Sequence, residues 1–306
     1  MMESLYVGLP LVSVVTITYN HEPYITKTIE GVMKQQVDFP IEYIVAEDCS
    51  TDKTREICKK YAAKYPDVIR LICSEQNVGP KENERRAFAA ARGKYIAFCE
   101  GDDYWTNPLK LQKQMDFLES HPEYSACFHR CRQYDESRKE FFDDDCGDVF
   151  KDGQDCVEVT EEMFFKKWIT QPLTMVYRRE CLPMSLYDKY ENYKDTFQIY
   201  NLLLKGKVAL FSFDGGVRNK HDGSVHGKIS LRKDCEYQIR DNAELFSYHK
   251  SDEVLKQYYL GILQWSIVSY IDNGWSRKRA LELIWRHFAV SKSVKSLAKN
   301  LKRLLL

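Results

Sequence analysis

The sequence has 306 residues, ten of them cysteines, and its 45 basic residues equal its 45 acidic residues in number. At about 150 residues per domain this length predicts one large domain or two small ones, and a content of 44% hydrophobic and 29% charged residues excludes collagen-like, low-complexity and wholly disordered chains. The balanced charge argues against a partner made of nucleic acid, which would call for a basic excess.

Residues near the amino terminus and the cysteines indicate the compartment. Glu3 lies where a secretory signal would carry basic residues, so a signal peptide is not expected. No run approaches the roughly 18 apolar residues of a membrane span. Cysteines such as Cys58 and Cys99 lie in or beside apolar segments without a CxxC pair, as buried thiols do in reducing conditions. We therefore predict a cytoplasmic protein.

The first hundred residues alternate between the two periodicities of regular structure. β-branched and apolar runs predict four buried strands, over residues 11–17, 41–46, 68–73 and 95–99. Apolar residues at helical spacing predict a helix after each of the first three strands. Strands that alternate with helices form right-handed units around a parallel sheet. We predict an α/β fold with a mostly parallel, Rossmann-like sheet flanked by helices.

The pattern is less regular after residue 105. It predicts a helix over residues 108–120, strands over residues 126–130, 173–177 and 208–213, and helices throughout the segment after Asp234. We therefore predict an α/β domain over residues 1–230 and a helical carboxyl-terminal extension over residues 231–306. The acidic residues at 143–148 lack the spacing and the glycine of a calcium-binding loop, so a solvated turn is expected there.

Polar segments follow three of the predicted strands, at residues 18–22, 47–52 and 100–105. The carboxyl ends of parallel strands meet at one edge of a sheet, where ligands bind, so these segments should line one crevice. No Gly-x-Gly-x-x-Gly or Gly-x-x-x-x-Gly-Lys sequence follows the first strand, which argues against dehydrogenases and common ATPases. Gathered carboxylates repel phosphate unless Mg²⁺ or Mn²⁺ lies between them, so we infer a metal-bridged nucleotide. Alternatively, Asp52 caps a helix and residues 100–103 form a plain acidic turn.

Three blocks of the sequence resemble the family 2 glycosyltransferases, which are inverting enzymes with a GT-A type fold. Residues 14–20 with Glu22 resemble the family's first nucleotide loop, and residues 44–52 resemble its strand that ends in two acids and a Ser-Thr-Asp turn. The third block, which leads to the acidic motif, contains Asn77, Gly79, Asn83, Arg86 and Gly93. The resemblance is specific over residues 11–120 and weak beyond them.

The resemblance implies roles for individual residues. Asp48 would accept a hydrogen bond from the nucleotide base, and Asp102 would bind Mn²⁺ or Mg²⁺ within an Asp-x-Asp motif whose first position is Glu100 here. His221 would be a third metal ligand or a phosphate contact, although a lone histidine is more often a surface residue. The other implied nucleotide-binding residues are Thr18, Tyr19, Asn20, Glu22, Asn83, Arg86, Glu100 and Gly101. The polar loop implied to close over the diphosphate contains Arg218, Lys220 and Ser224.

Inverting transfer also needs a base that deprotonates the acceptor hydroxyl. The resemblance places this base downstream, where a helix opens, and Asp195 is our candidate, with Glu191 in reserve. The helix is predicted to continue from Asp195 to Gly206. An alternative is that Asp195 and Gln198 form a capping box, and the helix amino terminus would then weaken Asp195 as a base.

The last residues form a basic amphipathic pattern. From Ser276 onward the sequence has nine Lys or Arg residues and a single acid, Glu282. At helical spacing, leucines fill one face of residues 292–305 and lysines fill most of the remainder. Such helices lie on anionic bilayers, but a final helix packed on its own domain fits the same pattern. Peripheral attachment at the cytoplasmic face of a membrane is therefore one of two interpretations.

Together, these features predict a metal-dependent inverting glycosyltransferase. By resemblance it would move a sugar from a nucleoside-diphosphate donor, expected to be a UDP-sugar, to a glycan or lipid-linked acceptor in surface polysaccharide biosynthesis. One alternative is a non-catalytic nucleotide-sugar-binding or scaffold protein. A sugar nucleotidyltransferase is disfavoured because residues 18–23 supply no glycine-rich basic loop for a triphosphate. The sequence leaves the sugar, acceptor, linkage and oligomeric state open.

Overall fold

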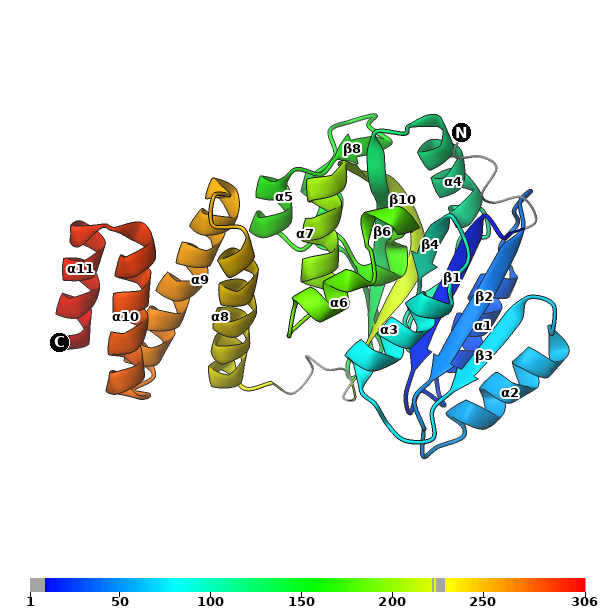
Figure 1. The fold of residues 1–306 in the computed structure, drawn as a ribbon, viewed down its shortest axis with the longest axis horizontal. Coiled ribbons are helices and arrows are strands. Elements are labelled where there is room, and N and C mark those ends of the chain that lie inside the picture. Colours follow the sequence, from blue (N-terminus) through cyan, green and yellow to red (C-terminus); the bar gives the residue numbers. More distant parts are fainter. Residues whose placement is uncertain (1–8, 222, 224–228, 306) are drawn as a thin grey trace. The chain divides into compact units, whose positions relative to one another are not determined.

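The computed structural model describes residues 9–221, 223 and 229–305. The chain divides into two compact units, with the division between residues 221 and 222. The first unit holds a single mixed sheet with helices packed on it, and the second is helical (Figure 1). The domain limits predicted from the sequence, with a boundary at residue 230, stay a prediction.

The first unit is built on a sheet with the strand order β3-β2-β1-β4-β9-β6-β10-β5. Its first four strands in this order are mutually parallel, and β9 pairs antiparallel with both β4 and β6. The strands are β1 (Val12–Thr18), β2 (Ile41–Glu47), β3 (Ile69–Cys73), β4 (Tyr95–Phe98), β5 (Tyr104–Trp105), β6 (Tyr124–Asp135), β7 (Glu140–Asp143), β8 (Cys156–Glu158), β9 (Val176–Arg178) and β10 (Lys207–Lys220).

Helices cover both faces of this sheet (Figure 1). They are α1 (Ile25–Met33), α2 (Thr54–Lys64), α3 (Pro80–Ala90), α4 (Lys110–Ser120), α5 (Glu161–Lys166), α6 (Ser185–Lys189) and α7 (Asp195–Lys205). Most valines and isoleucines of β1, β2 and β4 are almost completely buried, as expected for strands covered on both sides. Burial of these strands fixes their carboxyl ends, which carry the predicted site. The predicted α/β fold class is confirmed.

Two segments differ from the sequence-based expectation. The predicted strand over residues 173–177 is a 3₁₀ turn over Pro172–Thr174 followed by the short strand β9. The predicted strand over residues 208–213 extends to Lys220, so Arg218 and Lys220 lie on β10 and not in a loop. Register shifts near Asp214 let β10 pass Gly215 and Gly216 while it stays paired with β6.

The second unit contains four consecutive helices, α8 (Leu231–Tyr248), α9 (Glu253–Asp272), α10 (Arg277–Ser291) and α11 (Val294–Leu305). Side chains of Ser230, Asp252 and Ser276 accept hydrogen bonds from backbone N–H groups in the first turns of α8, α9 and α10, which explains where these helices begin. Their apolar faces form one core around Leu263 and Leu283.

The leucine face of α11 packs on this core. Leu297, Leu301 and Leu304 contact the cluster formed by the other helices, and the buried Asn300 exchanges two hydrogen bonds with Gln264 of α9, at 2.9 and 3.0 Å. This contact is the packing arrangement that the sequence offered as one of two interpretations. In the described part of the chain, no helix has the length and apolar character needed to cross a membrane.

Candidate functional site

The carboxyl ends of β1, β2 and β4 lie next to one another. Thr18 is in register with Glu47 at the end of β2, and the N–H of Gly101, just after β4, donates to the carbonyl of Ile17 at 3.0 Å. The polar segments that follow these strands therefore share one edge of the sheet. This alignment of parallel strand ends is the arrangement that the sequence-based prediction of a common crevice assumed.

The first two segments are tied together by side chain to backbone hydrogen bonds. The N–H of Asn20 donates to Ser50 Oγ at 3.0 Å, and Asn20 Oδ1 accepts from the N–H of Thr51 at 2.8 Å. Asn20 has a φ of 54°, a left-handed conformation that asparagine tolerates well. Asp52 accepts from the N–H groups of Glu22 and Thr54. Asp52 is thus a structural residue that holds both segments together. The alternative interpretation made it a helix cap, and the Thr54 N–H that donates to it is at the start of α2, where the N-cap residue Lys53 itself makes no side-chain cap.

The two acids at the end of β2 have different environments. Glu47 is completely buried, forms an ion pair with Arg55 and accepts from the N–H of Ser50 at 2.6 Å. Asp48 accepts at both oxygens, from the N–H groups of Val78 and Gly79, each at 2.9 Å. Glu47 therefore stabilises the turn itself, whereas Asp48 connects β2 to the segment that precedes α3.

Asn83 and Arg86 lie on α3 beside β2. The amide of Asn83 donates to the carbonyl of Ala46 at 2.9 Å, and its Oδ1 accepts from Arg86 at 2.6 Å. Arg86 also donates to Ser74 Oγ at 2.8 Å, while its buried Nε has no hydrogen-bond partner. These contacts anchor α3 to the end of β2. Both residues therefore stabilise the structure next to the predicted nucleotide site.

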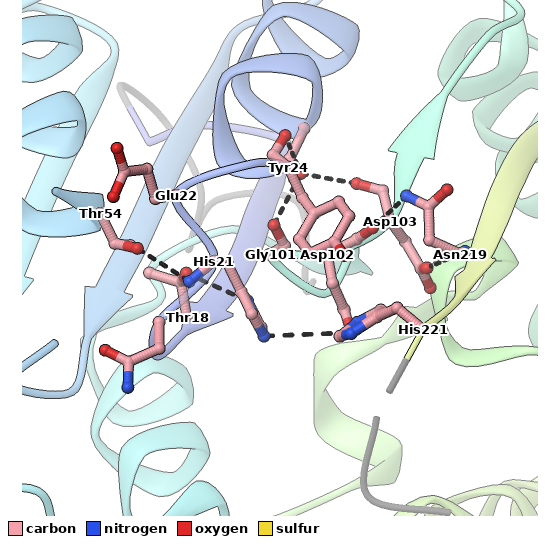
Figure 2. A network of polar contacts seen from close by, with 12 residues as sticks. Thr18, His21, Glu22, Tyr24, Thr54, Gly101, Asp102, Asp103, Asn219 and His221 are labelled. Carbon is pink, nitrogen blue, oxygen red and sulfur yellow. Dashed lines mark hydrogen bonds and ion pairs between the residues drawn. The ribbon is translucent and has the colours of Figure 1, made fainter. Parts of the chain in front are cut away.

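The acidic segment after β4 is held in place by its neighbours (Figure 2). The Thr28 hydroxyl is within hydrogen-bond distance of two carbonyl oxygens of this segment. Its Oγ1 lies 3.0 Å from the carbonyl oxygen of Gly101 and 2.6 Å from that of Asp103. The N–H of Asn219, on β10, donates to Asp103 Oδ1 at 2.8 Å. A Cβ at Gly101 would come within 2.8 Å of the side chains of Thr18 and His21, so glycine is required there by close packing. The side chain of Asp102 is directed toward His221 and is one-fifth exposed, at 20% of its surface.

Asp102 lies between two histidines (Figure 2). Its Oδ2 is 3.0 Å from His221 Nε2 and 3.9 Å from His21 Nε2. His21 Nδ1 lies 3.2 Å from Thr18 Oγ1, and the ring of His221 stacks on Tyr24 with 4.6 Å between centroids. These contacts orient both imidazoles and bring residues from β1, β4 and β10 to one point.

The carboxyls of this segment have divergent acidities. Burial alone would raise the pKa of Asp102, but the hydrogen bond from His221 and the charge of His21 lower it below its usual value. Burial, followed by the negative charges of Asp102 and Asp195, raises the pKa of Glu100 to about 8. Burial, followed by the negative charges of Asp102 and Glu100, raises the pKa of Asp103 well above its usual value. Asp102 is thus the carboxyl of this segment that favours its ionised form.

The two candidate bases are placed differently. Asp195 is half-buried at the start of α7 and is near enough to Glu100 for its negative charge to raise the pKa of that residue. Glu191 is exposed. The capping box is not formed, because no side chain caps α7 and the Gln198 amide donates instead to Glu84, at 2.6 Å. The geometry therefore brings Asp195 toward the acidic segment.

The predicted closing loop has a different structure from that expected. Arg218 is half-buried on β10, and its positive charge lowers the pKa of Glu100, so it faces the acidic segment. Lys220 is exposed and pairs with Asp135 of β6 at 3.2 Å. The expectation of a flexible loop is therefore wrong for both, because pairing with β6 continues through them. Ser224 lies outside the described residues.

A metal site is not preformed as a group of three ligands. Among the described residues, no three His, Cys, Asp or Glu side chains converge as a metal-binding group. The donor set of Asp102 and His221 nevertheless fits a divalent cation. Two ligands that each lie about 2.1 Å from an octahedral ion are about 3 Å apart, and Asp102 Oδ2 and His221 Nε2 are separated by 3.0 Å.

Sequence reasoning missed three residues of this region. His21 and Tyr24 contribute the second imidazole near Asp102 and the ring that stacks on His221, and Glu84 binds the first turn of α7. His21 follows the first strand directly, so its position among the polar strand ends was the available signal. Tyr24 and Glu84 lie in helical patterns, where nothing in the sequence distinguishes them from surface residues.

The comparisons with known proteins identify the family. A model described as glycosyl transferase family 2 matches residues 13–182, which is more than half of the chain. The chain therefore belongs to glycosyl transferase family 2.

Individual relatives match somewhat more than a third of the chain. An uncharacterized protein of Mycobacterium tuberculosis is 49% identical over 120 residues, which cover 39% of this chain and 35% of that protein. The putative teichuronic acid biosynthesis glycosyltransferase TuaG of Bacillus subtilis is 39% identical over 109 residues, covering 36% of this chain and 42% of TuaG. The chain thus matches less than half the length of these curated relatives.

Solved structures with the same fold span nearly the whole chain. The structure of Staphylococcus aureus TarS residues 1–349 with UDP-GlcNAc has a TM-score of 0.62 and 21% identity, and covers 96% of this chain and 89% of that one. The mannosyltransferase PcManGT of Pyrobaculum calidifontis with GDP-Man and Mn²⁺ has a TM-score of 0.51 and 17% identity, and covers 97% and 85%. At these identities the likeness establishes a GT-A type fold and nothing more.

Proposed function

We propose that this protein is a metal-dependent inverting glycosyltransferase that uses a nucleoside-diphosphate sugar. The observation that carries the proposal is the arrangement at the end of β4. There Asp102, whose pKa is lowered, lies 3.0 Å from His221, and the neighbouring Glu100 is close enough to Asp195 and Arg218 for their charges to change its pKa. Metal-binding groups, a candidate base and a cation that could meet phosphate thus border one edge of the sheet.

In this proposal the nucleotide binds over the ends of β1 and β2. Asp48 accepts two backbone N–H groups, which fix the direction of its carboxylate, and a carboxylate can accept further hydrogen bonds from a base edge. The residues proposed to surround the base and ribose are Thr18, Tyr19, Asn20, Glu22, Asp48, Asn83 and Arg86. Glu100 and Gly101 would lie beneath the sugar-linked diphosphate.

Asp102 and His221 would hold Mn²⁺ or Mg²⁺, and Arg218 would contact the diphosphate. When bound, the cation would act as a Lewis acid toward the departing diphosphate. Because Lys220 is paired with Asp135 at an exposed position, Arg218 is the stronger candidate for that phosphate contact. Ser224 stays a candidate from the sequence.

Asp195 would take the proton of the acceptor hydroxyl. The acceptor oxygen then attacks the anomeric carbon in line, the bond from that carbon to the diphosphate oxygen breaks, and the nucleoside diphosphate leaves. Attack opposite the leaving group inverts the anomeric configuration. A half-buried carboxylate close to the acidic segment suits this task, since general bases must be within reach of the proton they remove.

The relatives suggest the substrate class. TarS is named a poly(ribitol-phosphate) beta-N-acetylglucosaminyltransferase and has been crystallised with UDP-GlcNAc, and TuaG is named for teichuronic acid biosynthesis. We therefore propose a UDP-sugar, with UDP-GlcNAc tested first, as donor. The proposed acceptor is a glycan or lipid-linked precursor of a cell-surface polymer.

We further propose that the protein works in the cytoplasm, at the inner face of the membrane. Eight of the nine basic residues after Ser276 lie on α10 or α11, and the ninth, Lys292, lies between these helices. The two helices also expose Trp285, Val294 and Leu305. The leucines packed on the helical core are not free to insert, so attachment would use these exposed groups instead.

The proposed activity is tested by UDP release from a panel of UDP- and GDP-sugars with Mn²⁺. We expect release from one UDP-sugar, its loss on addition of EDTA, and a large loss in Asp195→Asn with UDP binding retained. Asp188→Asn, at an exposed acid of α6, is the matched control. A protein that binds UDP but releases none from any donor would instead be a non-catalytic nucleotide-sugar-binding protein.

A further inference from the structure

One face of α3 contacts the segment that carries Asp195. Lys81 and Glu84 are three residues apart on this helix, so their side chains lie on the same side of it. Both reach across to the segment from α6 to the first turn of α7. This connection joins residues more than 100 positions apart in the sequence.

Glu84 is the centre of the connection. Its Oε1 accepts a short hydrogen bond from the hydroxyl of Tyr187 on α6 and a second, of 2.6 Å, from the amide of Gln198 on α7. Gln198 is one turn beyond Asp195, so a bond that fixes Gln198 also fixes the turn from which Asp195 projects. A single carboxylate oxygen thus orients α6 and α7 relative to α3.

Lys81 holds the backbone between these two helices. Its Nζ donates to the carbonyl of Tyr190 at 2.9 Å and to that of Glu191 at 3.1 Å. Lys81 and Glu84 therefore fix the segment before Asp195 and the turn after it. Neither residue is needed to anchor α3 itself, since Asn83 and Arg86 do so on the side of β2.

The same helix begins at the predicted nucleotide site. α3 starts at Pro80, directly after the N–H groups of Val78 and Gly79 that donate to Asp48. An unbroken series of contacts consequently runs from Asp48 through the start of α3 to Glu84 and on to the first turn of α7. A helix is stiff over one turn, so its amino terminus and Glu84 move together.

We propose that Glu84 is a positioning residue that sets the place of Asp195 relative to the donor site, using the carboxylate as a shared acceptor for Tyr187 and Gln198. This inference rests on the proposed function, because it assumes that Asp195 is the base. It assigns to Glu84 a part in catalysis that requires no contact with the substrate.

The surroundings of Glu84 explain why an acceptor is needed there. Three tyrosines lie near Glu84, namely Tyr187, Tyr193 and Tyr177 of β9. Its acidic neighbours are Asp195 and Glu100. Burial and the charge of Asp195 raise the pKa of Glu84 to about 7, against the hydrogen bonds that it accepts. Since an apolar residue in its place would leave the Gln198 amide without its acceptor, the first turn of α7 would be free to shift.

The test combines Glu84→Leu and Glu84→Gln with Asp195→Asn. Glu84→Leu removes both hydrogen bonds at similar volume, and we expect it to lower UDP release from UDP-GlcNAc with Mn²⁺ by about tenfold or more, because small displacements of a catalytic group are costly. Glu84→Gln keeps an acceptor oxygen and should recover most of the rate. The affinity for UDP should change less than about twofold in both. Glu82→Leu, an exposed position on α3, is the control and should behave as wild type.

The double variant shows whether Glu84 acts through Asp195. In an Asp195→Asn background, Glu84→Leu should cause no further loss, since residues that act as a unit are not additive. A further loss there, a wild-type rate in Glu84→Leu, or an equal fall in UDP affinity would overturn the inference. If Glu84→Leu does not fold, Gln198→Leu removes the same contact from α7 and is expected to give the same pattern. An unchanged rate in Asp195→Asn alone would refute the base assignment instead.

Discussion

Two aspartates of the first unit illustrate how context decides what a carboxylate can do. Asp48 has a backbone N–H at each oxygen, so its orientation is fixed and its remaining lone pairs can accept further donors. Asp102 faces two imidazoles and has a lowered pKa, which suits a ligand for a cation. At the level of the residue, the proposed division between base recognition and metal binding follows from these partners.

Gly101 provides a prediction at the same scale. Replacement by alanine would bring its Cβ to 2.6 Å from Thr18 Oγ1 and 2.8 Å from His21 Nδ1. Because overpacking in a closely packed region typically costs about 1–3 kcal/mol, we expect Gly101→Ala to lower the free energy of unfolding by that amount. Urea denaturation measures this change.

The matched control is Gly147→Ala, since nothing lies within 4 Å of a Cβ at Gly147. Its stability should stay within about 0.5 kcal/mol of the wild type. Equal stability of both variants would mean that the segments after β1 and β4 are not as close as described.

The candidate residues differ in how far the sequence could identify them. Asp48, Asp102 and Gly101 follow buried β-branched runs, so the strand pattern alone put them at one edge of the sheet. Asp195 came from the family resemblance, and its proximity to Glu100 depends on the fold of residues 124–205. Glu84 and Tyr24 could not be found, because their roles arise from contacts with residues far away in the sequence.

At the scale of elements, the strands of the parallel half of the sheet were predicted closely from the sequence, and those of the second half only in part. The strands β1, β2 and β4 are covered on both faces and read as continuous apolar runs. By contrast, β10 passes two adjacent glycines and several polar residues, a pattern typical of a loop. Pairing with β6 along most of its length overrides that local preference.

The docking of α11 gives a prediction for this scale. Asn300 is almost completely buried and exchanges two hydrogen bonds with Gln264. Asn300→Ala would leave the Gln264 amide unsatisfied, which costs about 1–3 kcal/mol. We expect a fall of that size in the free energy of unfolding of the helical unit, measured by denaturation followed through circular dichroism.

Lys299→Ala, at the exposed neighbouring position of α11, should change stability by less than about 0.5 kcal/mol. If Asn300→Ala were equally mild, α11 would not depend on the buried amide pair for its place on α9.

At the scale of the whole molecule, the distribution of charge bears on whether the protein binds a membrane surface. The chain is neutral overall, yet the residues after Ser276 have nine basic groups and one acid. The remaining sequence is therefore acidic, and the basic excess lies on the last two helices. A basic surface can bind either anionic lipid or a soluble acidic partner. Binding to lipid is favoured only if exposed apolar groups are buried in the membrane as well.

Vesicle flotation tests this distribution. We expect the protein to float with vesicles that contain phosphatidylglycerol, to float less in high salt, and to stay unbound with phosphatidylcholine alone. Replacing Lys295, Lys299 and Lys302 by glutamate should abolish flotation, because each basic residue near such a surface contributes about 1 kcal/mol.

The same charge change on α2, at Lys59, Lys60 and Lys64, is the control and should leave flotation intact. These lysines are also exposed but belong to the first unit. Equal loss in both triple variants would indicate a general electrostatic effect and not a docking surface on α10 and α11.

The central claim is that Asp102 at the end of β4 holds a divalent cation that neutralises the donor's diphosphate, and calorimetry of UDP binding tests it most directly. We predict that UDP binds the wild type tightly with Mn²⁺ and weakly with EDTA, and that Asp102→Asn loses at least about tenfold in Mn²⁺-dependent affinity. Asp143→Asn, at an exposed acid of β7, should match the wild type. Affinity that is unchanged by EDTA, or equally reduced in the two variants, would contradict the claim.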